Sequence, residues 1–272
     1  MGLVHRIRLD PPLLVRGMVM GIANIIPGVS GGTLAVVLGI YDQLIGAISG
    51  VFRTRQDRSE NVLFLAHVAG GALIAIAALA TVIDYLYESF THPTVYFFSG
   101  LIIGSIPVVY RQHTQMRPSP VHAVFLLAGI VSVIALSLLA PDNGATVSGN
   151  GGIVLFFIAG IASAAAMIVP GFSGSFVLVV MGVYWRLIDA VNQFDVITLI
   201  PPILGGIVGI VFVSRGIEIV LNRYPTKFYY FIIGLLIASV WKLYPGMPHG
   251  VMLAASAVTL IAGALIAIRL SE

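Results

Sequence analysis

The sequence predicts an all-α integral membrane protein built as an inverted-topology repeat, each half a broken or re-entrant helix hairpin followed by three transmembrane helices. Three observations predict this fold. The 272 residues are 58% hydrophobic and 9% charged, with a mean hydropathy of +1.04, whereas soluble domains carry about 25% charged residues. Residues 17–48 recur without a gap as 160–191, and fourteen of the 32 paired positions are identical. Three long apolar stretches follow each copy.

The two hairpins are expected at residues 12–52 and 153–194. Each is interrupted within apolar sequence by a Pro-Gly-x-Ser-Gly motif, which begins at Pro27 in the first copy and at Pro170 in the second. Proline ends the incoming helix because it lacks a donor N–H and disfavours helical geometry in the preceding residue. Residues 13–26 give about 21 Å of helix, which is short of a hydrocarbon core of about 30 Å. This length favours a hairpin that enters and leaves the membrane on one side.

Six further apolar stretches approach the roughly 20 residues needed to cross a bilayer. Turn signals rich in proline and glycine separate them. The stretches are 62–83, 95–110, 121–140, 196–213, 228–241 and 251–268. The Gly-, Ser- and Asn-rich segment 143–152 joins the two halves. We therefore expect residues 1–142 to form the first repeat and 143–272 the second, within a single membrane domain.

The distribution of charge predicts the orientation. If each hairpin returns to its starting side, all of the 14 Lys and Arg residues share one face except Arg186 and Lys242. The positive-inside rule makes that face cytoplasmic, so we expect a multi-pass protein of the cytoplasmic (inner) membrane with both termini in the cytoplasm. Three crossings in the first half invert the second hairpin, which brings the two tips together near the midplane. Charge counting fits two full spans per hairpin equally well.

The interrupted tips carry the predicted substrate site. Their glycines permit tight turns and close approach, and their serines are suited to N-cap the helices expected to start near Thr33 and Ser175. Free N–H groups and the positive end of a helix dipole favour an anion such as phosphate or carboxylate. The predicted substrate-binding residues are Asn24, Pro27, Gly28, Ser30, Gly31, Gly32, Thr33, Pro170, Gly171, Ser173, Gly174, Ser175 and Arg186.

Some of these residues have a second interpretation. Arg186, expected on the outgoing helix of the second hairpin, either attracts an anionic headgroup at the outer mouth or snorkels to the membrane interface. Asn24 either bonds a ligand or caps a buried carbonyl. The prolines and glycines of one tip alone would fit a plain kink between tightly packed helices. Duplication in register favours a site.

The composition and the motifs of the chain exclude several functional classes. The chain has no cysteine, which excludes disulfides and thiolate chemistry. It has neither a His-Glu-x-x-His motif nor paired carboxylates at metal spacing, and no nucleophile, base and acid lie together in sequence. No metal, cofactor or catalytic residue is therefore predicted. No clustered basic face with base-stacking residues indicates nucleic-acid binding.

Four stretches carry a family resemblance, namely 21–33 (GIANIIPGVSGGT), 39–42 (GIYD), 170–175 (PGFSGS) and 182–184 (GVY). The chain resembles, over nearly its whole length, a bacterial and archaeal membrane family long catalogued as a domain of unknown function and associated with translocation of polyprenyl phosphate, chiefly undecaprenyl phosphate. The resemblance implies a flippase that returns the spent lipid carrier, after cell-wall polymerisation, to the cytoplasmic leaflet by alternating access. Ser175-Phe176 replaces the Gly-Thr of the first copy, so the two tips need not contact the ligand equally.

The expected partners are the polyprenyl phosphate lipid and the bilayer, and the sequence leaves open a homo-oligomer and a coupling ion, either proton or sodium. Two alternative functions stand beside the flippase. One is a secondary transporter of a small soluble anion, which the same tips would serve. The other, less favoured, is a membrane enzyme acting on polyprenyl phosphates. A lateral opening toward lipid would favour the lipid substrate, and a closed aqueous pathway would favour the soluble anion.

Overall fold

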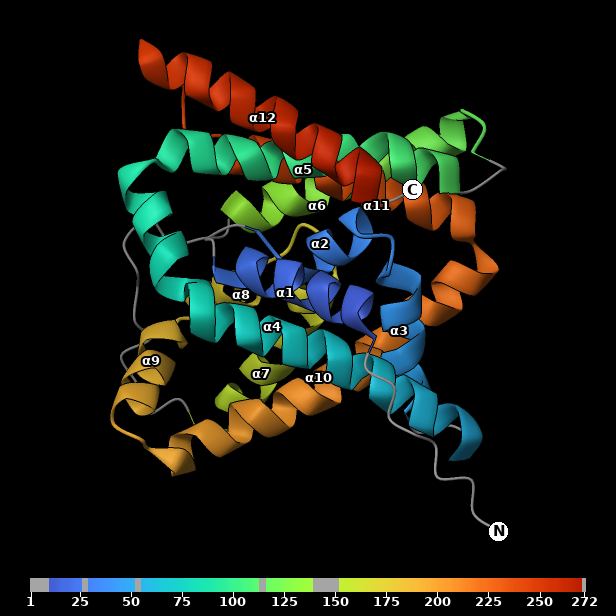
Figure 1. Cartoon of the computed structure of the whole chain (residues 1–272). Helices are drawn as coiled ribbons and strands as arrows, with labels where there is room; N and C mark the ends of the chain where they lie inside the picture. The colour runs from blue at the N-terminus through green and yellow to red at the C-terminus, as the bar shows by residue number, and fades with distance from the viewer. Residues whose placement is uncertain (1–9, 26–28, 52–54, 113–115, 139–151, 271–272) are drawn as a thin grey trace.

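The computed structural model describes residues 10–25, 29–51, 55–112, 116–138 and 152–270, and in these ranges it contains twelve α-helices and no strand. Pro27, Gly28 and most of the predicted junction 143–152 lie outside the described residues. The helices are α1 (Pro11–Ile25), α2 (Gly31–Val37), α3 (Tyr41–Gly50), α4 (Arg55–Ser89), α5 (Thr91–Gln112), α6 (Pro120–Leu138), α7 (Ile153–Ile168), α8 (Gly174–Val180), α9 (Tyr184–Asn192), α10 (Val196–Arg223), α11 (Pro225–Leu243) and α12 (Val251–Leu270) (Figure 1).

Six of the described helices, α4, α5, α6, α10, α11 and α12, are long and apolar enough to cross a membrane. They coincide with the six predicted stretches, so the all-helical membrane class is confirmed. The helices that lead to the two interruptions are shorter, with 15 residues in α1 and 16 in α7. Their lengths correspond to about 22 to 24 Å, less than a full hydrocarbon core.

The outgoing arm of each hairpin is two helices, which corrects the expected single helix. Helix α2 ends at Val37 and α3 starts at Tyr41, while α8 ends at Val180 and α9 starts at Tyr184. Glycines with positive φ separate them, Gly39 at 67° and Gly182 at 71°. A left-handed residue cannot continue a right-handed helix, so the chain changes direction there. The bend between α8 and α9 is 113°.

The helices pack in pairs that recur in the two halves. Helix α1 packs on α4 and α7 packs on α10, each within one half, whereas α5 packs on α12 and α6 on α11 between halves; Figure 1 shows α5 beside α12 and α1 beside α4. Glycines bring the paired backbones into contact, since a Cβ built on any of them would overlap a carbonyl oxygen of the partner helix. Such close approach through small residues is typical of helix packing in membranes.

These glycine contacts are equivalent in the two halves. On each helix, the residues that make these contacts are separated from their counterparts on the equivalent helix of the other half by the same number of positions in the sequence. Within halves the equivalent contacts are Gly17–Val68 with Gly160–Pro202, and Leu14–Gly71 with Phe157–Gly205. Between halves they are Gly100–Leu260 with Gly234–Leu126, and Phe97–Gly263 with Phe231–Gly129. The similarity of the two halves therefore extends beyond the hairpins to all six spans.

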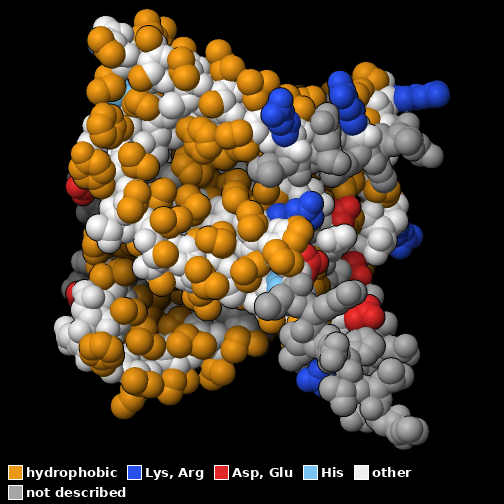
Figure 2. Space-filling view, viewed as in Figure 1, with side chains coloured by type: hydrophobic (Ala, Val, Ile, Leu, Met, Phe, Trp, Pro, Cys, Tyr) orange, Lys and Arg blue, Asp and Glu red, His pale blue; other side chains and the backbone are white. Residues whose placement is uncertain are grey.

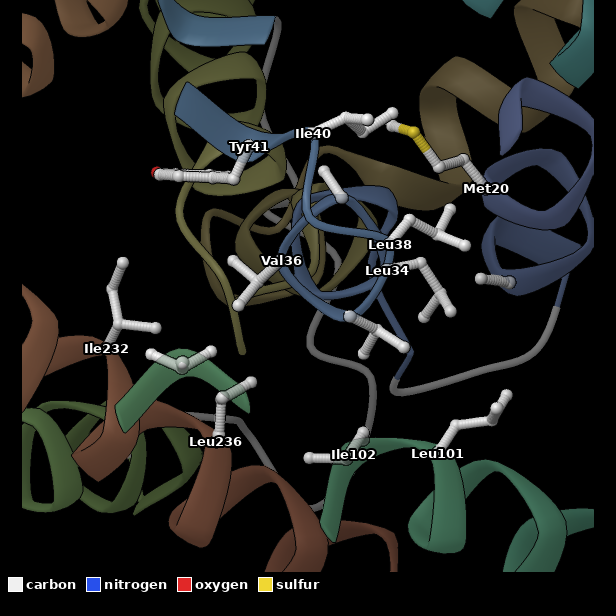
Figure 3. Close-up of a cluster of buried hydrophobic side chains, with 14 of the residues drawn as sticks. Met20, Leu34, Val36, Leu38, Ile40, Tyr41, Leu101, Ile102, Ile232 and Leu236 are labelled. Atoms are coloured by element: carbon white, nitrogen blue, oxygen red, sulfur yellow. The ribbon is translucent and has the colours of Figure 1, made fainter. Parts of the chain in front are cut away.

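The main hydrophobic core surrounds α2, and every residue of this helix is buried. Figure 3 shows its side chains projecting toward three other helices. The neighbours labelled there are Met20 of α1, Leu101 and Ile102 of α5, and Ile232 and Leu236 of α11. In α8, the counterpart of α2, only Gly174 is buried. The first hairpin is therefore enclosed by the spans, and the second is less covered.

Charged side chains are segregated on the surface. In Figure 2 hydrophobic side chains cover most of the visible face, while Lys and Arg gather toward the right, on the side of α3. Large aliphatic and aromatic residues are exposed along the spanning helices, including Leu73 on α4, Val124 on α6 and Phe212 on α10. Exposed apolar surface on this scale is what lipid tails cover in a membrane protein.

Candidate functional site

The interrupted segments of the two repeats meet. The backbone N–H of Gly171 donates a hydrogen bond of 2.8 Å to Oγ1 of Thr33. Gly32 lies against the end of α7, where a Cβ would come within 2.8 Å of the Met167 carbonyl oxygen and 2.7 Å of that of Ile168. The structure thus brings Gly32 and Thr33 of the first predicted set together with Gly171 of the second.

The first tip is closed by its own side chains. Ser30 occupies the N-cap of α2, and its Oγ accepts from the N–H of Thr33 at 3.2 Å and lies 2.9 Å from Thr33 Oγ1. The N–H of Gly31 donates to Oδ1 of Asn24 at 2.8 Å. Asn24 therefore caps a backbone N–H, and not the buried carbonyl considered from the sequence. Two of the backbone N–H donors in the first turn of α2, those of Gly31 and Thr33, are therefore already satisfied. Ser30 and Thr33 are buried, with 4% and 1% of their surface exposed.

The second tip is open. Ser173 occupies the N-cap position of α8, but its side chain makes no capping hydrogen bond, contrary to the prediction. Its Oγ instead lies 2.8 Å from Oγ of Ser175, and this hydroxyl pair is exposed. The counterparts of Asn24 and Thr33 in this repeat are Met167 and Phe176, neither of which can accept a hydrogen bond strongly. The first turn of α8 therefore keeps donors that its own side chains do not cap.

Close packing positions the second tip against α11 and α7. Gly171 has φ of 84°, and a Cβ there would lie 2.6 Å from Ser239 Oγ and 3.1 Å from the Leu235 carbonyl oxygen. Pro170 is buried beside it. Gly174 faces α7, where a Cβ would come within 2.7 Å of Ser163 Oγ. Glycine is needed at both positions because neighbouring helices leave no room for a side chain.

Lys242 of α11 is the residue that sequence reasoning missed. Its Nζ lies 3.9 Å from the ring centroid of Phe176, within the first turn of α8, and the side chain is half-buried. Lys242 lies about one helical turn after Ser239 on α11, and Ser239 contacts Gly171. A positive charge therefore lies beside the open tip. Lys242 stood out in sequence only as one of two basic residues opposite the basic face, and no local pattern connected it to the tip.

Arg186 lies apart from the helix that starts at Gly174. It is exposed on α9, beyond the bend at Gly182. Hydrogen bonds from Thr198 hold the pKa of Asp195 below its usual value, and the nearby Arg186 guanidinium lowers that pKa further. Asp195 N-caps α10, so the structure places Arg186 near the start of this helix.

A second polar region lies between α3, α10 and α11. Its cavity of about 500 Å³ is lined by residues that include Asp42, Glu218 and Tyr229. The Tyr229 hydroxyl donates to Asp42 Oδ2 at 2.6 Å, and the Ser49 hydroxyl donates to Glu218 Oε2 at 2.6 Å. The first of these hydrogen bonds links α3 to α11, and the second links α3 to α10. Two carboxylates make the cavity unfavourable for phosphate, and among the described residues no group of three His, Asp or Glu is placed to hold a metal.

In the described residues, six helices apolar enough to cross a membrane, two interrupted hairpins in contact and a lysine beside the open tip define a multi-pass membrane protein with discontinuous helices, the architecture of many secondary transporters. The family model for undecaprenyl phosphate translocase-like proteins matches residues 20–265, and the chain belongs to this family. It is 33% identical to the polyprenyl-phosphate transporter of Staphylococcus aureus over 95% of both chains. It is 32% identical to the polyprenyl-phosphate transporter of Vibrio cholerae over 85% of this chain and 76% of the relative. No solved structure matches the chain.

Proposed function

We propose that this protein is a flippase that returns polyprenyl phosphate, chiefly undecaprenyl phosphate, to the cytoplasmic leaflet of the cytoplasmic membrane by alternating access. The contact that carries the proposal is the hydrogen bond from Gly171 N–H to Thr33 Oγ1, which joins the two repeats at their interruptions. The family and the names of both relatives support polyprenyl phosphate as the transported lipid and a transporter in place of an enzyme. Alternating access, direction and the site residues are our proposal.

We propose that the two halves, 1–142 and 143–272, form an inverted repeat. The equivalent glycine contacts support it, because those between halves exchange partners: α5 packs on α12 as α11 packs on α6. A twofold axis between the halves produces this exchange. Three crossings separate the hairpins, so the axis lies in the membrane plane and the hairpins open to opposite sides.

The two tips then serve opposite sides of the membrane. The first tip is capped by Asn24 and Ser30 and enclosed by spans, whereas the Ser173 and Ser175 hydroxyls of the second are exposed. Helix α3 is fastened to α10 and α11, while its counterpart α9 packs mainly on α10 and α8 among the described helices. We assign this arrangement to the state that admits substrate from outside and is shut toward the cytoplasm.

Electrostatics explains why a phosphate would use such a path. A phosphate monoester carries a charge of about −1.5 to −2 at pH 7, and moving an isolated charge into a low-dielectric core is prohibitively costly. The second tip offers hydroxyls, uncapped N–H groups and the Lys242 ammonium, which together replace the hydration of the headgroup. The apolar chain stays in lipid, so only the headgroup needs a polar route.

The test is translocation of a labelled undecaprenyl phosphate in proteoliposomes, with uptake of inorganic phosphate measured in parallel. We expect Ser173→Ala to weaken apparent affinity about fivefold, because one neutral hydrogen bond contributes about 1 kcal/mol, with no change in melting temperature. Its counterpart Ser30→Ala removes a buried N-cap and should lower the stability by about 1 kcal/mol. Inorganic phosphate uptake without lipid movement would establish the soluble-anion transporter instead, and an unaltered affinity in Ser173→Ala would remove this hydroxyl from the site.

Orientation is tested independently of transport. We expect a reporter fused at Glu272 to be cytoplasmic and one inserted between residues 141 and 150 to be outside, since twelve basic residues share the predicted inner face. Paired alkaline phosphatase and green fluorescent protein fusions read the two sides. Identical locations for both fusions would contradict the predicted number of crossings.

A further inference from the structure

An apolar groove opens on the lipid-facing side of α10, between this helix, α11 and α6. It has a volume of about 770 Å³, and its walls include Phe212, Ile217, Val220, Phe228 and Phe231. Phe212 is 74% exposed and Val220 42% exposed. The groove therefore opens laterally toward the bilayer. From Phe212 to Tyr224 it follows α10 for about 18 Å.

One end of this groove is cationic. Lys227, in the first turn of α11, places its Nζ 5.0 Å from the Tyr224 ring centroid and 5.6 Å from that of Phe125. The Arg223 guanidinium also lies near this end, 5.6 Å from the centroid of the same Tyr224 ring. The opposite end, at Phe212, is apolar. The groove thus has the polarity of a lipid with one anionic headgroup, and the proposed orientation places the cationic end at the cytoplasmic interface.

We infer that this groove binds the isoprenoid chain of polyprenyl phosphate in the cytoplasmic leaflet, with the phosphate at Lys227 and Arg223. The inference rests on the proposed function, and it adds where the lipid lies when its headgroup is on the cytoplasmic side. Aromatic rings line the groove along much of its length, and flat ring faces pack well against a chain of planar alkene units. The carboxylates of Asp42 and Glu218 line the separate cavity described above.

Gly216 provides a variant that blocks the groove without disturbing the packing. It is exposed in the groove wall, and a Cβ built on it meets no atom within 4 Å. Gly216→Phe therefore adds a ring to open space, and Gly216→Ala is the matched control that leaves the space empty. Lys227→Met removes the cationic end while keeping the length of the side chain.

The experiment uses the full chain in nanodiscs and a benzophenone-bearing undecaprenyl phosphate. We expect the probe to label peptides from residues 212–231. Unlabelled undecaprenyl phosphate should compete with this labelling, and phosphatidylglycerol at the same concentration should not. Gly216→Phe should abolish this labelling and Gly216→Ala should retain it, while Lys227→Met should reduce it about tenfold, the effect of losing one charged hydrogen bond.

Unaltered labelling in Gly216→Phe, or equal competition by phosphatidylglycerol, would overturn the assignment, the latter by showing a groove for ordinary lipid chains. Failure of the proposed function gives a different result. Labelling in the groove without translocation by the unmodified protein would reject the flippase and leave the polyprenyl chain site in place.

Discussion

Gly174→Val is expected to reduce polyprenyl phosphate translocation at least about 100-fold, a loss typical of misplacing a binding group by about 1 Å. A Cβ at this position would lie 2.6 Å from Met167 Cγ, 2.7 Å from Ser163 Oγ and 2.8 Å from the Ser163 carbonyl oxygen. The backbone carbonyl cannot move aside, so valine must push the start of α8 away from α7. That shift displaces the Ser173 and Ser175 hydroxyls from the open tip. Headgroup accessibility in proteoliposomes measures the loss.

Two controls separate this effect from failure to insert. Gly70→Val is the matched change, because Gly70 lies on a spanning helix where a Cβ meets no atom within 4 Å, and it should transport normally. Gly31→Val should have a smaller effect than Gly174→Val, since the three atoms nearest its Cβ belong to the Asn24 side chain, at 3.0 Å and beyond, and a side chain yields more easily than a backbone carbonyl. Normal transport by Gly174→Val at normal protein levels would show that the second tip is a packing feature alone.

Lys242→Met is expected to lower translocation about 10- to 100-fold, corresponding to about 1.5–3 kcal/mol for a hydrogen bond to a charged group. Lys242 is the half-buried cation beside Phe176 and the uncapped start of α8. In the proposed site its ammonium offsets the phosphate charge, so on its removal the apparent KM for the lipid should rise by a larger factor than the amount of folded protein falls. Lys242→Arg keeps the charge and should retain most of the activity.

Arg269→Met is the matched control for Lys242. It removes the same single positive charge from an exposed position at the far end of α12, and it should transport like the unmodified protein. Equal activity of Lys242→Met and Arg269→Met across lipid concentrations would show that Lys242 serves Phe176 packing and takes no part in headgroup binding.

Much of the fold could be predicted because the bilayer imposes simple rules on sequence. Each of the six spanning helices needs about 20 apolar residues and nothing more specific, and all six appeared where composition placed them. The interruptions were marked by proline and glycine in both copies, and the helices after them start at Gly31 and Gly174. These positions are within two residues of the expected starts near Thr33 and Ser175.

The second break in each hairpin was missed although its signal was present. Gly39 and Gly182 are identical in the two copies, but a lone glycine is tolerated inside a helix at about 1 kcal/mol. Only the backbone shows that both adopt positive φ. Position in space decided the other misses. Lys242 lies far along the chain from Phe176, and the capping role of Asn24 depends on where its side chain turns.

The glycine contacts between halves restrict the kind of motion open to this molecule. Helices α5 and α12, and likewise α6 and α11, touch backbone to backbone at Gly100, Gly263, Gly129 and Gly234, and a side chain carried into any of these contacts by sliding would collide with a carbonyl oxygen. Each pair contains one helix from each half, so the two pairs form two rigid contacts between the halves. Rocking of one half as a rigid body would have to break both of these helix–helix contacts. Beyond the glycine hinges at Gly39 and Gly182, helices α3 and α9 show no such glycine-to-carbonyl contact among the described residues, so we expect the two sides to be gated by local swinging of α3 and α9 within a stationary frame.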